Sequence, residues 1–143
     1  MPRIHIAIMR RSWGLTKKIL SGEKTVETRW YMNKYKPWDQ VSKGDIIYFK
    51  DSGGPVTVKA KVSGVKQYTN LDEKGREKIF NKYSQQDLGV SEVMSEIKAY
   101  IKNKRYCIII HLKSPKKVTP FNINKDGYGA MASWLIVDDI RED

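Results

Sequence analysis

The sequence has few of the residues that cross-link chains or hold metal ions. It contains one cysteine, Cys107, and two histidines in 143 residues, so an intrachain disulfide is excluded. Cys107 and His111 fall in one predicted strand, where the extended chain separates them by about 13 Å. That is too far to share a metal ion, and no zinc-ligand spacing occurs elsewhere in the sequence. The sequence therefore predicts neither a metal site nor a cofactor.

Long apolar runs are also missing. No stretch has the length of a transmembrane helix, and no N-terminal segment combines a basic start, an apolar core and a small-residue cleavage site. We therefore expect a cytoplasmic protein that does not enter membranes, with Cys107 as a buried, inert thiol. A phosphate-binding loop, a G-x-G-x-x-G motif and a nucleophile elbow are absent as well, which sets aside several enzyme classes.

Acidic residues are outnumbered by basic ones. The chain has 27 Lys and Arg against 16 Asp and Glu, for a formal net charge of +11. This balance favours a polyanionic partner, with nucleic acid first and an anionic membrane surface second, although a generically basic protein is the alternative. The length predicts a single domain over residues 1–143 that can bury a core without cross-links. Composition does not define the oligomeric state.

The hydrophobic pattern predicts a mixture of strands and helices, and hence an α+β fold. Period-2 alternation and apolar runs predict strands at residues 3–9, 25–30, 46–50, 56–68, 105–112 and 130–140. Helical spacing predicts helices at residues 13–20, 70–83 and 91–101, with a break at 84–89. The glycine-rich turn at 51–55 predicts a hairpin of the strands at 46–50 and 56–68, the second of which is expected to bend at Gly64. Residues 113–117 are interpreted as a basic connection and 121–129 as a loop.

The first predicted helix has start and stop signals. Ser12 is a good N-cap, and Gly22 stands where a glycine ends a helix. Arg10 and Arg11 come directly before this helix, whose free N–H groups attract anions. The corner formed by these residues is a candidate phosphate site.

Gly22, Lys24, Glu27 and Arg29 follow that helix at fixed spacing. If the segment is a strand, Glu27 and Arg29 share one face, and the carboxylate can orient the guanidinium. The alternative is a solvated surface pair that contributes roughly 0–1 kcal/mol.

This G-x-K-x-x-E-x-R spacing behind a helix resembles the ASCH domain, a member of the PUA-like superfamily. The resemblance covers residues 4–65 well and the rest by general layout. It implies a small β-barrel with flanking helices and a cleft under the motif that binds RNA, single-stranded or carrying a modified nucleoside. The candidate nucleic-acid contacts are Arg10, Arg11, Ser12, Trp13, Lys24, Arg29, Trp30 and Tyr31.

Aromatic and basic residues alternate after the motif. Tyr31, Tyr35 and Trp38 are interleaved with Lys34 and Lys36. Aromatic rings stack on bases while cations follow the phosphates, so this segment suits single-stranded nucleic acid. Equally, its rings can cap the barrel core. Near the C-terminus, Ser133 and Trp134 are likewise candidates to line the cleft, with core the favoured alternative for Trp134.

Two other functions stay open. Some ASCH proteins are hydrolases that deacetylate N4-acetylcytidine or cleave RNA, and the resemblance implies that Lys24 and Glu27 are then the catalytic candidates. Lys24 can be a general base if burial or a nearby cation lowers its pKa. The deacetylating group carries threonine where this chain has Glu27, and only Glu73 and Glu77 lie where its further glutamate is expected. The last alternative is an adaptor whose basic face meets an acidic protein.

Overall fold

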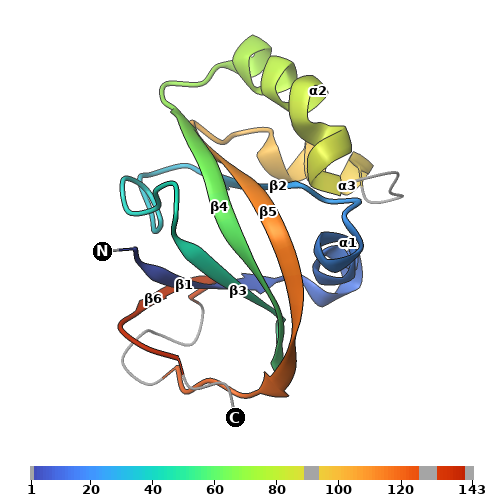
Figure 1. The fold of residues 1–143 in the computed structure, drawn as a ribbon. Helices are drawn as coiled ribbons and strands as arrows, with labels where there is room; N and C mark the ends of the chain where they lie inside the picture. Colours follow the sequence, from blue (N-terminus) through green and yellow to red (C-terminus); the bar gives the residue numbers. More distant parts are fainter. Residues whose placement is uncertain (1, 89–93, 126–131, 141–143) are drawn as a thin grey trace.

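The computed structural model describes residues 2–88, 94–125 and 132–140, and six strands and three α-helices lie in them (Figure 1). The strands are β1 (Ile4–Met9), β2 (Val26–Tyr31), β3 (Ile46–Asp51), β4 (Val56–Tyr68), β5 (Tyr106–Phe121) and β6 (Trp134–Val137). The helices are α1 (Leu15–Ser21), α2 (Glu73–Leu88) and α3 (Met94–Ile101), with one 3-10 turn, η1 (Arg11–Trp13), before α1.

The six strands form one curled sheet, a half-barrel in the order β2-β5-β4-β3-β1-β6. Neighbouring strands are antiparallel except β1 and β3, which are parallel. Helix α1 packs against β3, β4 and β5, whereas α2 lies beside β2 and α3 (Figure 1). The predicted α+β architecture around a barrel-like sheet with flanking helices is confirmed. Strands β2 and β6 stand at the two ends of the strand order.

Strand β5 lies between β2 and β4, as expected for the most apolar run. Four consecutive side chains, Cys107 to Ile110, have no exposed surface, so both faces of this strand are covered. The predicted hairpin of β3 and β4 is also confirmed, and the β4 register shifts between Val62 and Gly64, where a bend was expected. No helix in the described part of the chain is long and apolar enough to cross a membrane.

The first helix begins later than its sequence predicts. Ser12 is not an N-cap, because it lies inside the 3-10 turn and the backbone reverses at Gly14 (φ 62°) before α1 starts at Leu15. A left-handed φ favours glycine, which has no Cβ to clash. The predicted stop is correct: Gly22 has φ 86° and its N–H donates to the carbonyl of Ile19.

Helix α2 is longer than predicted at one end and shorter at the other. The cap is Asp72, whose carboxylate accepts the Gly75 N–H at 2.8 Å, and Asn70 instead has a left-handed φ of 52°. The predicted break at 84–89 is wrong, since the helix runs to Leu88. Ser91, the predicted start of the next helix, lies outside the described residues.

The basic segment 113–117 is a strand and not a connection. It continues β5 and pairs with β4, with Lys116 opposite Lys59 and Lys113 opposite Lys61. Among the described strands, β4 alone pairs with this half of β5, because the pairing of β2 ends at His111. Lysines and a proline are tolerated at such an open edge, where their charges also discourage edge-to-edge association. Of the strand predicted at 130–140, residues 130–131 lie outside the described part of the chain, and the rest contains the shorter β6.

Candidate functional site

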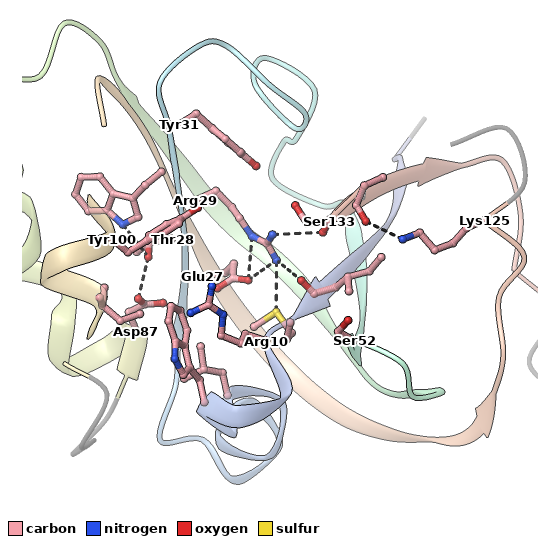
Figure 2. A pocket seen from close by; sticks show the side chains of 17 residues that line it. Arg10, Glu27, Thr28, Arg29, Tyr31, Ser52, Asp87, Tyr100, Lys125 and Ser133 are labelled. Carbon is pink, nitrogen blue, oxygen red and sulfur yellow. Dashed lines mark hydrogen bonds and ion pairs between the residues drawn. The ribbon is translucent and has the colours of Figure 1, made fainter. Parts of the chain in front are cut away.

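A pocket of about 450 Å³ opens between the two ends of the curled sheet (Figure 2). One wall is β2, and the other is the end of β1 together with the residues before β6. Helix α3 and the η1 turn close its sides. The lining residues are Ile8, Met9, Arg10, Trp13, Leu15, Glu27, Thr28, Arg29, Trp30, Tyr31, Ser52, Asp87, Ile97, Tyr100, Lys125, Ala132 and Ser133.

The Arg29 side chain spans the gap between these sheet ends (Figure 2). From β2 its guanidinium donates to the carbonyl of Ile8 at 3.4 Å and to that of Ser133 at 3.3 Å. On its own strand it donates to Glu27 Oε2 through Nη2 at 3.0 Å and Nε at 3.3 Å. The guanidinium is therefore held rigidly by acceptors on both sides.

The predicted pairing of Glu27 with Arg29 is confirmed, but it is not a solvated surface pair. Glu27 is 3% exposed and Lys24 is 1% exposed. The three donors of the Lys24 ammonium are all used, on the carbonyl of Val26 at 2.7 Å, on Glu27 Oε1 at 3.0 Å and on Asp87. Lys24 therefore has no donor left for a ligand.

The charges in this cluster reinforce one another. Burial alone lowers the pKa of Lys24, but Asp87 and Glu27 outweigh it and raise that pKa above its usual value. Burial raises the pKa of Glu27, and the cations Lys24 and Arg29 more than reverse this, so it ends below its usual value. The direction for Lys24 is opposite to the one that a general base requires. Two cations and two carboxylates also cancel in net charge.

Asp87 also accepts a hydrogen bond from the Thr28 hydroxyl, and both residues line the pocket. Its Oδ2 accepts the Thr28 hydroxyl at 2.8 Å, and that hydroxyl in turn accepts the Trp30 indole N–H at 3.3 Å. Burial raises the pKa of Asp87, with repulsion from Glu27 added, against the attraction of Lys24. Thr28, Trp30 and Asp87 thus form one hydrogen-bonded chain along the pocket wall.

Flat rings make another wall of the pocket. The Arg10 guanidinium lies 4.4 Å from the ring centre of Trp13, which meets Tyr100 edge to face at 6.5 Å. The Trp13 indole N–H donates to Glu96 on α3 at 2.8 Å, which fixes the ring. Arg10 is exposed above it. A cation thus stands beside an aromatic surface at the rim.

Of the eight candidate contacts in the sequence, the pocket brings five together: Arg10, Trp13, Arg29, Trp30 and Tyr31. The other three do not line it. Arg11 and Ser12 are exposed in the η1 turn, and the Arg11 guanidinium packs near Gly54. Glu73 and Glu77 lie at a different hollow, between α2 and α3.

Trp134 lies in the core, as favoured from the sequence, and its ring packs beside the Arg29 guanidinium. It is 3% exposed and its indole N–H donates to His5 Nδ1 at 3.0 Å. The other ring nitrogen of His5 bonds Asp45 at 2.8 Å, so the neutral ring carries its proton on Nε2. Arg29 lies 5.0 Å from the centre of the Trp134 ring.

Sequence reasoning missed Asp87 and Lys125, whereas Ser133 was a candidate for the cleft and does line the pocket. Asp87 falls in the segment predicted as a helix break, and it reaches β2 only because α2 runs on beside that strand. Ser133 offers a backbone carbonyl, which no sequence pattern identifies. Among the described residues, no group of three His, Cys, Asp or Glu is placed to hold a metal ion.

Comparisons with known proteins agree with this fold. The model of the ASCH domain family matches residues 15–121. The solved ASCH structure from Zymomonas mobilis is similar with a TM-score of 0.68 at 15% identity, over 94% of this chain and 87% of that chain. For a variant of that protein the TM-score is 0.69 at 15% identity, over 96% and 92% of the two chains. A protein from Enterococcus faecalis has a TM-score of 0.51 at 12% identity, over 87% and 84%. No curated protein matches the sequence.

Proposed function

Because this chain belongs to the ASCH domain family, a family linked to RNA binding or hydrolysis, we propose that its pocket binds one nucleotide of an RNA. The RNA is single-stranded or carries a modified base. The base enters the pocket among its aromatic rings, and the phosphates lie toward the cationic rim. The observation that carries this proposal is the set of rings around the fixed guanidinium of Arg29.

The aromatic walls suit a nucleobase. Trp13 and Tyr31 come from different elements and both line the pocket. Stacking of a base on such a ring contributes about 1–3 kcal/mol and tolerates any base. A fixed guanidinium and backbone carbonyls beside the rings supply polar groups that a base edge can meet.

The charges divide between two roles. Arg29 is neutralised by Glu27, so it orients a ligand more than it attracts one. Long-range attraction of an anion comes from the net charge of the molecule, which is +11, and near the pocket from the exposed Arg10. Affinity for RNA is then expected to fall steeply with salt, because each phosphate contact releases counterions.

Arg10 and Arg11 form a matched pair for testing this site. They are adjacent, exposed and identical in charge, but only Arg10 lines the pocket. A titration of single-stranded RNA into wild type, Arg10→Ala and Arg11→Ala at several salt concentrations should show a clear loss of affinity for Arg10→Ala. The slope of log K against log salt should also fall by about 0.7 for that variant.

Equal losses in the two variants would mean that only net charge matters and would reject the pocket. Absence of RNA binding by wild type would reject the function. Arg29→Ala should also bind weakly, but it removes the bonds to Ile8 and Ser133 as well. Its melting temperature must therefore be measured beside its affinity.

A second candidate function is hydrolysis of a modified nucleoside or of RNA, and one observation favours it. The Thr28 hydroxyl lines the pocket and donates to the buried carboxylate of Asp87. On N4-acetylcytidine, the Thr28 oxygen would bond to the acetyl carbon while its proton passed to Asp87 and then to the departing nitrogen. Water would then release acetate. Lys24 and Glu27 would hold Asp87 and Arg29 in place during this reaction.

Mass spectrometry of recovered RNA separates the two functions. RNA containing N4-acetylcytidine is incubated with wild type, Thr28→Val and Glu27→Ala. Deacetylated or shortened RNA from wild type, with turnover lost in both variants, would establish the hydrolase. Unchanged RNA bound by wild type leaves binding as the function. Full turnover by Thr28→Val would exclude this hydroxyl as the nucleophile.

A further inference from the structure

The segment after β2 holds an aromatic ring in solvent. Tyr35 is 69% exposed, the largest exposure among the big hydrophobic side chains of the described residues. Its ring stacks on that of Tyr31 with centres 6.1 Å apart and planes inclined by 29°. Because Tyr31 lines the pocket, the two rings form a short ladder from the pocket to its outside.

The backbone under Tyr35 is held in place by several bonds. The Tyr31 hydroxyl donates to the carbonyl of Lys36 at 2.6 Å, and the Trp38 N–H donates to the carbonyl of Tyr35 at 2.8 Å. Burial raises the pKa of Tyr31 to about 12, so its hydroxyl stays a donor at neutral pH. Further along, Asp39 makes two bonds of 2.7 Å with the side chain of Gln67.

The two interpretations of this aromatic segment therefore apply to different residues. Trp38 caps the core, since it packs against the main apolar cluster and meets Tyr106 edge to face at 5.4 Å. Tyr35 does not: it belongs to no apolar cluster, and its only aromatic neighbour in the described part of the chain is Tyr31. Exposed Lys34 and Lys36 stand on either side of it.

We propose that Tyr35 is a second stacking site, which binds the base next to the one in the pocket. This inference rests on the proposed function and adds the ligand's length to it: a strand of at least two nucleotides. The neighbouring base lies on the outer face of the Tyr35 ring, and its phosphate lies near Lys34 or Lys36. Because the loop is already ordered by its backbone bonds, little conformational entropy is lost when the base stacks.

A length series tests the second site separately from the first. Adenosine 5′-monophosphate, the adenosine dinucleotide and the hexanucleotide, with their uridine counterparts, are titrated by calorimetry into wild type and three variants. The variants are Tyr35→Ala, Tyr35→Leu, which keeps apolar volume without a flat ring, and Tyr35→Phe, which keeps the ring.

Wild type should bind the dinucleotide more tightly than the mononucleotide. Tyr35→Ala and Tyr35→Leu should lose about 5- to 150-fold in dinucleotide affinity, whereas Tyr35→Phe should match wild type. All four proteins should bind the mononucleotide equally, because the Tyr35 ring lies outside the pocket.

Each other outcome overturns a specific claim. If wild type binds both lengths equally, or if Tyr35→Ala keeps the dinucleotide affinity, the second site is rejected and the pocket stands. If Tyr35→Leu behaves as wild type, apolar contact and not stacking is responsible, and the proposal fails. If wild type binds no member of the series, the pocket and the second site are both rejected.

Discussion

Replacement of Lys24 by methionine tests whether the most buried charge of the motif is structural. The Lys24 ammonium has no exposed surface and bonds Glu27, Asp87 and a backbone carbonyl. Methionine fills similar space without charge. Glu27 keeps Arg29 as a partner in the variant, whereas Asp87 keeps, among the described residues, the Thr28 hydroxyl alone. A buried carboxylate is then left without a cation.

The size of the effect follows from that unpaired carboxylate. Removal of one partner of a buried ion pair costs about 3–5 kcal/mol. This is a large part of the roughly 5–15 kcal/mol that stabilises a typical domain. The double variant Lys24→Met with Asp87→Asn removes one charge of each sign, and the asparagine can still accept the Thr28 hydroxyl. It should recover about 0.5–3 kcal/mol of the loss, the usual range for coupled neighbours.

Urea unfolding followed by tryptophan fluorescence measures the free energy of unfolding of wild type, both single variants and the double variant. A structural role for the Lys24 ion pairs is refuted if Lys24→Met costs less than about 1 kcal/mol, or if the two single losses simply add. It is also refuted if Lys24→Met keeps its stability but loses RNA affinity, since that result would make Lys24 a ligand contact.

Three further predictions concern other parts of the fold. Burial lowers the pKa of His5 in the folded state, so the unfolded chain binds a proton on this ring more readily. The contribution of His5 to stability is therefore complete above a pH of about 6.5 and decreases as the pH falls below that value. His5→Gln, which can still accept from Trp134 and donate to Asp45, should flatten the acid side of a melting-temperature profile, and an unchanged profile would argue against this ring. Gly22→Ala should lower the free energy of unfolding by about 1–2 kcal/mol, because a φ of 86° is strained for a residue with a Cβ. No atom lies within 4 Å of the added Cβ, so no steric clash adds to this strain. Denaturation without a measurable loss of stability would contradict the strain. Cys107 has no exposed surface and burial raises the pKa of its thiol, so a disulfide reagent that reports thiols by absorbance should react only in denaturant, and rapid reaction with the native protein would contradict the burial.

The strands and the motif could be predicted from the sequence because their signals are local. Period-2 alternation identifies β1 and β4, the glycine-rich turn identifies the hairpin of β3 and β4, and Gly22 ends α1 by its freedom to adopt a positive φ. The spacing of Glu27 and Arg29 along one strand likewise predicts their ion pair, since side chains two residues apart share a face.

Other features depend on what the chain meets after folding. Residues 113–117 have the composition of a loop, yet they form a strand because β4 offers an unpaired edge beside them. In the same way, residues 84–88 stay helical and are held there by tertiary contacts, since Asp87 bonds Lys24 and Thr28.

The sequence alone determined the basic charge, the motif, the positions of most strands along the chain and the resemblance to the ASCH domain, because each depends on residue type and short spacing. Only the tertiary structure decided which charges are available to a ligand. Asp87 lies on α2, 63 residues after Lys24, and accepts the third hydrogen bond of the Lys24 ammonium. The carbonyls of Ile8 and Ser133 fix Arg29 across the open ends of the sheet. Such long-range contacts are set by how the sheet curls, and no local pattern encodes them.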